Sequence, residues 1–212
     1  RVFYTNDVLP AMEQVVESKV EKLVGLAEEC GVPLKETKSV IRRGVHVFSE
    51  LGLSAFIYFL RECVAPQIQG HLEQLVEVLP SASRDGPRQA MQNVARLRQV
   101  MRDAADRLAS SGELTGFPNV TDKATRLLDL VRQMQQTGDT TRVIIFCEQT
   151  VLAHPVAHLV QHHTRCKAGT CTGVGSMTDG QRKQALQSFR SGDVPLLTCT
   201  AALEEGLDVS EC

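Results

Sequence analysis

The stretch RVIIFCEQTVLAHPVAHLVQ (Arg142–Gln161) decides the fold of the chain. Its first part, RVIIFC, is a short run of β-branched residues bounded by turn residues, which is typical of a buried parallel strand. Its second part predicts a helix from Thr150 to Gln161. A strand that runs straight into a helix is half of a βαβ unit, so we expect a parallel sheet here.

The same alternation continues after Gln161. KAGTCTG (Lys167–Gly173) predicts a weaker strand ending in a glycine loop, and VPLLTCT (Val194–Thr200) predicts another buried strand. The helix between them, Thr178 to Arg190, opens with Thr178 and Gln181 as a capping box and is ended by Gly192. The predicted fold class is therefore α/β, a parallel sheet flanked by helices.

The chain before this sheet is predicted to be all-α. Apolar residues recur at three- and four-residue steps from Asn6 to about Ala109. The predicted helices are Asp7–Glu29, Leu34–Ser49, Leu51–Val78 and Arg88–Ala109, and a further one at Val120–Gln136. Pro66 should kink or divide the third helix. We predict two domains, an all-α domain at 1–116 and an α/β domain at 117–212.

Composition excludes several classes of protein. The formal net charge is −2, so charge alone gives no argument for nucleic acid. The longest apolar stretch, Leu53–Leu60, is too short to cross a bilayer, and no membrane partner is expected. Seven cysteines without a CxxC pair favour a reducing intracellular compartment, cytoplasmic or nuclear. We predict no metal site, because the spacing of His162, His163, Cys166 and Cys171 matches no closed zinc pattern.

Three blocks of the α/β part carry a resemblance. They are RVIIFCEQT (Arg142–Thr150), TGVGSMTDGQRKQALQSFRSGD (Thr172–Asp193) and LLTCTAALEEGLDV (Leu196–Val209). In this order they resemble motifs IV, IVa/IVb and V of superfamily 2 helicases, in the form of the Dicer and antiviral RNA-sensor branch. The helical part resembles the insertion of Dicer-like helicases, above all in ELGLSAFIYFLRECV (Glu50–Val64). The resemblance implies a helical insertion followed by part of a second RecA-like domain.

The resemblance also implies roles for single residues. RNA backbone contacts are expected at Cys147, Glu148, Thr172, Gly173, Gln181 and Thr200, with Thr172 and Thr200 donating hydroxyl hydrogen bonds to phosphates. Gly206 and Asp208 are expected at the ATP ribose, and Glu205 in coupling the two motor domains while it lies near RNA. No catalytic residue is assigned, since ATP phosphates and Mg²⁺ would be held mainly by parts of the protein outside these residues.

The implied partners are double-stranded RNA, the first RecA-like domain, and a protein with a double-stranded RNA-binding domain on the helical insertion. We expect the chain to be a piece of a longer Dicer-like endoribonuclease that is an ATP-dependent helicase, and to be inactive by itself. Two other functions stay open: a Hef-like DNA translocase, and an insertion that acts mainly as a protein-docking module.

Several of these residues also have a plain structural interpretation. The TGVG loop is compatible with an ordinary β–α turn, and the pair Glu204–Glu205 with a solvated turn. Thr178 and Gln181 are first of all a helix cap. For the arginines at 88, 96, 98, 102 and 107, a solvated and partly paired helix face is expected rather than an RNA contact, since Asp103 and Asp106 interrupt them.

Overall fold

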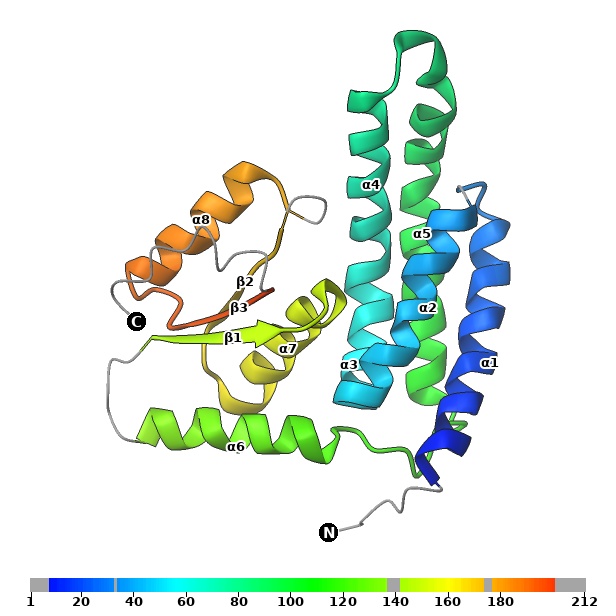
Figure 1. The fold of residues 1–212 in the computed structure, drawn as a ribbon. Coiled ribbons are helices and arrows are strands. Elements are labelled where there is room, and N and C mark those ends of the chain that lie inside the picture. The colour runs from blue at the N-terminus through cyan, green and yellow to red at the C-terminus, as the bar shows by residue number, and fades with distance from the viewer. Residues whose placement is uncertain (1–7, 33, 137–141, 174–176, 201–212) are drawn as a thin grey trace. The chain divides into compact units, whose positions relative to one another are not determined.

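The computed structural model describes residues 8–32, 34–136, 142–173 and 177–200. It divides into two compact units, Arg1–Thr121 and Asp122–Cys212. The described part of the first unit is all-α, and that of the second contains a parallel sheet with helices (Figure 1). Among the described helices, none has the length and apolar character needed to cross a membrane.

The first unit is a helical bundle. Its elements are α1 (Val8–Glu28), α2 (Leu34–Leu51), α3 (Leu53–Tyr58), a π-helical turn η1 (Phe59–Cys63), α4 (Val64–Val78), a short 3-10 turn η2 (Ser81–Ser83) and α5 (Asp85–Ser110). Helix α1 packs mainly on α2, whereas α5 packs along η1 and α4 (Figure 1).

Aromatic side chains form the centre of this bundle. Phe48, Phe56 and Phe59 are at most 1% exposed, and the rings of Phe48 and Phe56 meet edge to face with their centroids 6.4 Å apart. Burial of such large apolar groups is the main favourable contribution to folding. These three phenylalanines therefore form part of the core of the bundle.

Pro66 acts on the helix that precedes it. The predicted helix from Leu51 to Val78 is divided into α3, η1 and α4, and the π-helical turn ends at Cys63, shortly before the proline. Proline lacks the N–H that an α-helix would donate to the carbonyl four residues earlier, and a π-helical turn is one way to absorb that loss. The expected division therefore occurs, but as a change of helix type.

The segment after α5 closes the bundle. The N–H groups of Leu53 and Ser54 donate to the carbonyls of Pro118 and Asn119 at 2.9 and 3.0 Å, and the hydroxyl of Thr121 donates to the carbonyl of Glu50 at 2.6 Å. These bonds explain why the units divide after Thr121, whereas the sequence had suggested a division at Gly116.

The second unit has a RecA-like arrangement of strands and helices. Its elements are α6 (Asp122–Gln136), β1 (Val143–Cys147), α7 (Thr150–Thr164), β2 (Ala168–Cys171), α8 (Asp179–Arg190) and β3 (Leu196–Thr200). All strands are parallel, in the order β1-β3-β2. Helix α7 packs on β2, β3 and α6, and α8 packs on β2.

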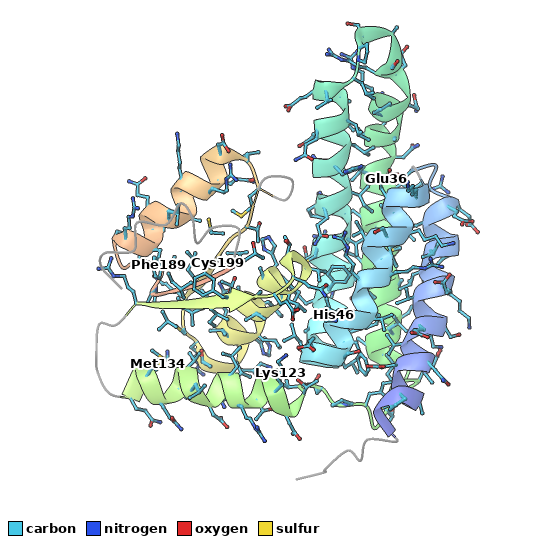
Figure 2. The ribbon with its side chains drawn as sticks, in the orientation of Figure 1. Glu36, His46, Lys123, Met134, Phe189 and Cys199 are labelled. Carbon is cyan, nitrogen blue, oxygen red and sulfur yellow. The ribbon has the colours of Figure 1, made fainter. Side chains whose placement is uncertain are left out.

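The two faces of the sheet are covered differently. Phe189 of α8, Cys171 of β2 and Leu197 of β3 form a buried cluster on one face, and Figure 2 labels Phe189. On the α7 face, the buried side chain of Thr198 donates or accepts hydrogen bonds with its neighbours in α7 and β2. With both faces covered, β2 and β3 are almost continuously buried, as expected of a parallel sheet.

Candidate nucleic-acid interface

The predicted contact residues come together at the carboxyl edge of the sheet. Cys147 at the end of β1 is the register partner of Thr200 at the end of β3, and Cys171 of β2 is the partner of Cys199. Thr172 follows Cys171 directly and is therefore level with Thr200. Cys147, Thr200 and Thr172 form one row across three strands, at the edge where open α/β sheets place their ligands.

The side chains of this row are buried. Thr172 is 0% exposed, and Thr200 and Cys147 are each 6% exposed. The backbone N–H of Thr172 donates to the sulfur of Met177 at 3.3 Å. A phosphate would reach the two hydroxyls only after the groups around them move. Their role as donors to RNA stays a prediction.

The thiol of Cys147 is not a nucleophile in this setting. Burial raises its pKa to about 11, because the charged thiolate loses solvation inside the protein. At neutral pH the group is an uncharged thiol, so any contact with nucleic acid at this position would be neutral.

Two further members of the predicted set lie beside the row. Glu148 is exposed and Gly173 is half-buried. Gln149 next to Glu148 is the N-terminal cap residue of α7 and has extended backbone, but its side chain makes no capping hydrogen bond. The backbone N–H groups of the first turn of α7 therefore begin at the same edge of the sheet.

The capping box of α8 forms as predicted. The N–H of Gln181 donates to the hydroxyl of Thr178 at 3.3 Å, and the N–H of Thr178 donates to the side-chain oxygen of Gln181 at 2.9 Å. Gln181 is exposed, and only its oxygen is used in this cap. Its amide nitrogen takes no part in the cap, so an additional contact of this group with RNA remains a prediction.

Some predicted residues lie outside the described part of the chain. They include Glu205, Gly206 and Asp208, the residues assigned to ATP and to coupling, and also Gly175 of the glycine loop. Within the described ranges, no group of three or more His, Cys, Asp or Glu residues is placed to hold a metal ion.

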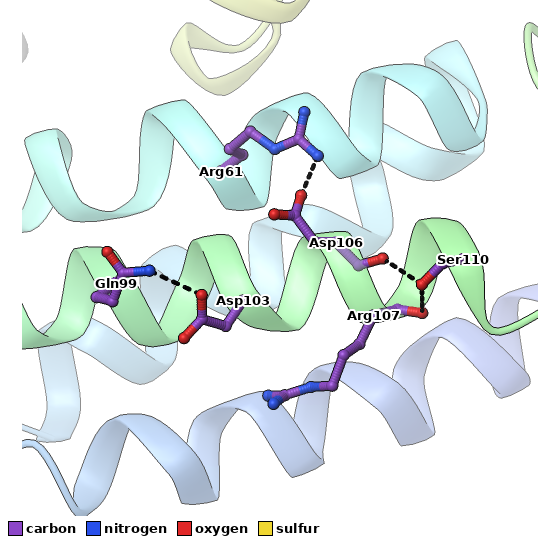
Figure 3. A network of polar contacts seen from close by, with 6 residues as sticks. All are labelled: Arg61, Gln99, Asp103, Asp106, Arg107 and Ser110. Carbon is purple, nitrogen blue, oxygen red and sulfur yellow. Dashed lines mark hydrogen bonds and ion pairs between the residues drawn. The ribbon is translucent and has the colours of Figure 1, made fainter.

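The arginines of α5 divide into two sets. Arg98 donates to Gln69 at 3.4 Å and Arg102 to Glu62 at 2.9 Å, so both tie α5 to α4 and η1. Arg61 of η1 pairs with Asp106 in the same way (Figure 3). Arg88, Arg96 and Arg107 are exposed. The partly paired helix face that the charge pattern predicted is confirmed for Arg98 and Arg102.

Sequence reasoning missed Thr198, whose hydrogen bonds connect β3 with β2 and α7 next to the carboxyl edge of the sheet. Its hydroxyl lies 2.9 Å from the carbonyl of Ala153, 3.1 Å from that of Gly169 and 3.0 Å from the hydroxyl of Thr170. The available signal was a threonine in the middle of a strand that is otherwise apolar, since a buried hydroxyl needs partners.

Comparison with known proteins gives a family for the second unit. Residues 122–212 match the helicase conserved C-terminal domain. These residues are a helicase C-terminal domain. The match includes the whole row of Cys147, Thr200 and Thr172.

A Dicer-like relative extends the likeness beyond this domain. Dicer-like protein 1 of Aspergillus clavatus is 27% identical, in an alignment covering 98% of this chain and 15% of that protein. The DEAD-box ATP-dependent DNA helicase Fancm of Drosophila melanogaster is 34% identical over 48% of this chain and 8% of its own length. The Hef helicase domain of Pyrococcus furiosus aligns with 98% of this chain and 39% of its own, at 16% identity and a TM-score of 0.43.

The helicase domain match and the Dicer-like relatives together support a Dicer-like superfamily 2 helicase C-terminal region. The chain spans a small part of these relatives, 15% of the Aspergillus protein and 8% of the Drosophila one.

Proposed function

We propose that this helicase region is part of an ATP-dependent motor that moves on double-stranded RNA, within a Dicer-like endoribonuclease. The observation that carries the proposal is the row of Cys147, Thr200 and Thr172 across the carboxyl ends of three parallel strands. The Dicer-like relatives that align with nearly all of the chain favour RNA as the substrate.

The proposed grip on RNA relies on hydroxyl and backbone groups. Thr172 and Thr200 would donate to phosphate oxygens, with Gly173 allowing close approach and Cys147, Glu148 and Gln181 beside them. Hydroxyls and backbone N–H groups bind phosphate without sequence preference, which is what a translocating motor requires. A domain without a strongly basic surface can bind in this way, in agreement with the net charge of −2.

The proposed ATP contacts belong to the segment after β3. We propose that Asp208 accepts hydrogen bonds from the ribose hydroxyls, that Gly206 permits the turn beside it, and that Glu205 couples the motor domains. ATP phosphates and Mg²⁺ would be bound mainly by the first RecA-like domain. The chain alone is therefore expected to have no ATPase activity.

Two further partners belong to the proposal. The first RecA-like domain would complete the motor, and a protein with a double-stranded RNA-binding domain would dock on the helical unit. The six described cysteines are all buried, which is compatible with a reducing intracellular location, cytoplasmic or nuclear.

A DNA motor of Hef type is the second candidate, favoured by the Drosophila relative that is named a DNA helicase. The deciding experiment measures ATP hydrolysis by the intact parent protein with blunt RNA duplexes and with DNA duplexes of the same sequence. We expect stimulation by RNA of about tenfold over DNA, since recognition of the RNA 2′-hydroxyls and A-form shape favours RNA. Equal or stronger stimulation by DNA would reject the RNA assignment.

A further inference from the structure

The helical unit contains a cavity that the proposed motor does not use. It has a volume of about 410 Å³ and lies between α1 and the C-terminal part of α5. Leu23, Leu26, Ala104 and Leu108 supply its apolar lining, and Leu23 and Ala104 are each 4% exposed. The volume falls within the range of small binding pockets, about 300–1,000 Å³.

Cationic side chains also line the cavity, beside its apolar residues. Lys19, Lys22 and Arg107 line the cavity, and Glu113 is the only acidic residue among the described residues that do so. Lys19 is paired with Glu113. Figure 3 shows the side chain of Arg107 reaching from α5 toward α1, while Arg61 and Asp106 pair with each other. Since the chain as a whole is slightly acidic, this local excess of positive charge is a property of the cavity.

We propose that this cavity binds a peptide segment of a partner protein in which an apolar side chain stands beside an aspartate or glutamate. The apolar side chain would fill the space between Leu23, Leu26 and Leu108. The carboxylate would lie at the rim between Lys22 and Arg107. Both groups recur in short peptides that dock in helical grooves, where apolar anchors give affinity and charges fix register.

The surroundings favour such a peptide over a nucleic-acid backbone. Sugar and phosphate groups have nothing to bury against the apolar lining. The hydroxyls of Ser110 and Ser111, which line the cavity, already donate to backbone carbonyls of α5. A single carboxylate held by Arg107 suits this place better than a run of phosphates.

The test selects short random peptides, displayed on phage, on the immobilised 212-residue chain. Selected peptides should carry Asp or Glu next to Leu, Ile, Met or Phe. Synthetic versions should bind Lys22→Ala and Arg107→Ala about threefold to tenfold more weakly than the unchanged chain, as expected for the loss of one rim charge. Arg88→Ala is the matched control, because Arg88 is exposed on the same helix but does not line the cavity.

A charge exchange makes the assignment specific. Arg107→Glu should lose the selected peptide, and a peptide with its acid replaced by lysine should recover binding to that variant, while melting temperatures of all variants stay alike. Peptides without an acid–apolar pair, or affinities that do not change in Arg107→Glu, would overturn the proposal. So would a short RNA duplex that competes with the peptide at this cavity. The outcome is independent of the proposed RNA contact at Cys147, Thr200 and Thr172, because the cavity and this row belong to different units.

Discussion

The hydroxyl of Thr198 lies 3.0 Å from the hydroxyl of Thr170, inside the sheet, where Thr198 is fully buried and Thr170 is 9% exposed. Thr198 also reaches the carbonyls of Ala153 in α7 and Gly169 in β2. One side chain therefore joins β3, β2 and α7, the elements that present the carboxyl edge.

Replacing Thr198 by valine should destabilise the chain by about 1–3 kcal/mol, because the shape is kept while buried polar partners lose their hydrogen bonds. Urea denaturation followed by circular dichroism measures this free energy of unfolding. Thr198→Ser keeps the hydroxyl and should retain more stability than the valine variant. If valine were as stable as the unchanged chain, the hydroxyl network would contribute nothing.

Gly52 offers a second stability test. Its φ is 97°, and an added Cβ would lie 2.8 Å from the carbonyl oxygen of Asn119 and 2.9 Å from that of Pro118. Gly52→Ala should therefore cost about 2 kcal/mol or more, since both the backbone conformation and the close approach are incompatible with a side chain.

The matched control is Gly25→Ala in the last turn of α1, where an added Cβ meets nothing within 4 Å. This change should stabilise by about 0.5–1 kcal/mol through helix propensity. Thermal melting of both variants decides the matter. A Gly52→Ala protein that melts no lower than the Gly25→Ala protein contradicts the packing of residues 118–120 against α3.

Gly52 and Thr198 show which features the sequence alone does not predict. The capping box of Thr178 and Gln181 was predictable, because its partners are three residues apart and their geometry is local. The helices and strands followed from apolar periodicity for the same reason. Thr198 and Ala153 are far apart in the chain, and so are Gly52 and Pro118, so only the packed structure brings them together.

The candidate interface was predictable to a similar degree. Parallel strands place their carboxyl ends at one edge, so the row of Cys147, Thr200 and Thr172 followed from the strand pattern and the resemblance. The full burial of Thr172 was not foreseeable, because it depends on what packs around the loop. The cavity between α1 and α5 had no signal either, as its lining comes from two distant segments.

Buried thiols predict a loss of stability in alkaline solution. Burial raises the pKa of Cys63 to about 12 and of Cys147 to about 11, above the ordinary value of 9.0. Between about pH 9 and pH 11, both thiols stay protonated in the folded chain but ionise in the unfolded chain. Their contribution to the free energy of unfolding is therefore complete below about pH 9 and is lost as the pH rises toward 11 to 12.

Urea midpoints at about pH 8 and about pH 10 measure this effect. The midpoint should fall at the higher pH, and it should fall less in Cys147→Ala, which removes one of the buried thiols with a raised pKa. The same fall in both proteins would mean that Cys147 is not shielded from ionisation as its burial indicates.

The proposed RNA contact at the row of Cys147, Thr200 and Thr172 predicts losses of affinity that are independent of RNA sequence. In the intact parent protein, Thr200→Ala and Thr172→Ala should each weaken duplex RNA binding by about 1 kcal/mol, the contribution of one phosphate hydrogen bond. Fluorescence anisotropy with two duplexes of unrelated sequence measures it. Thr200→Ser is the control that keeps the hydroxyl. Losses confined to one duplex would indicate base recognition and oppose a motor.

Gln181 allows the helix cap to be separated from RNA binding. Its side-chain oxygen accepts from the N–H of Thr178, and glutamate performs the same part of a capping box. Gln181→Glu should therefore leave the free energy of unfolding within about 0.5 kcal/mol of the unchanged chain. It replaces the amide donor by a negative charge, which repels phosphate. Duplex RNA binding by the parent protein should fall about threefold to tenfold.

Thr178→Ala provides the opposite case, since it removes the cap, costs about 1 kcal/mol of stability and leaves the amide of Gln181 in place. If RNA affinity follows stability in both variants, Gln181 serves only as a cap; if affinity falls in Gln181→Glu while stability does not, Gln181 contacts the RNA backbone.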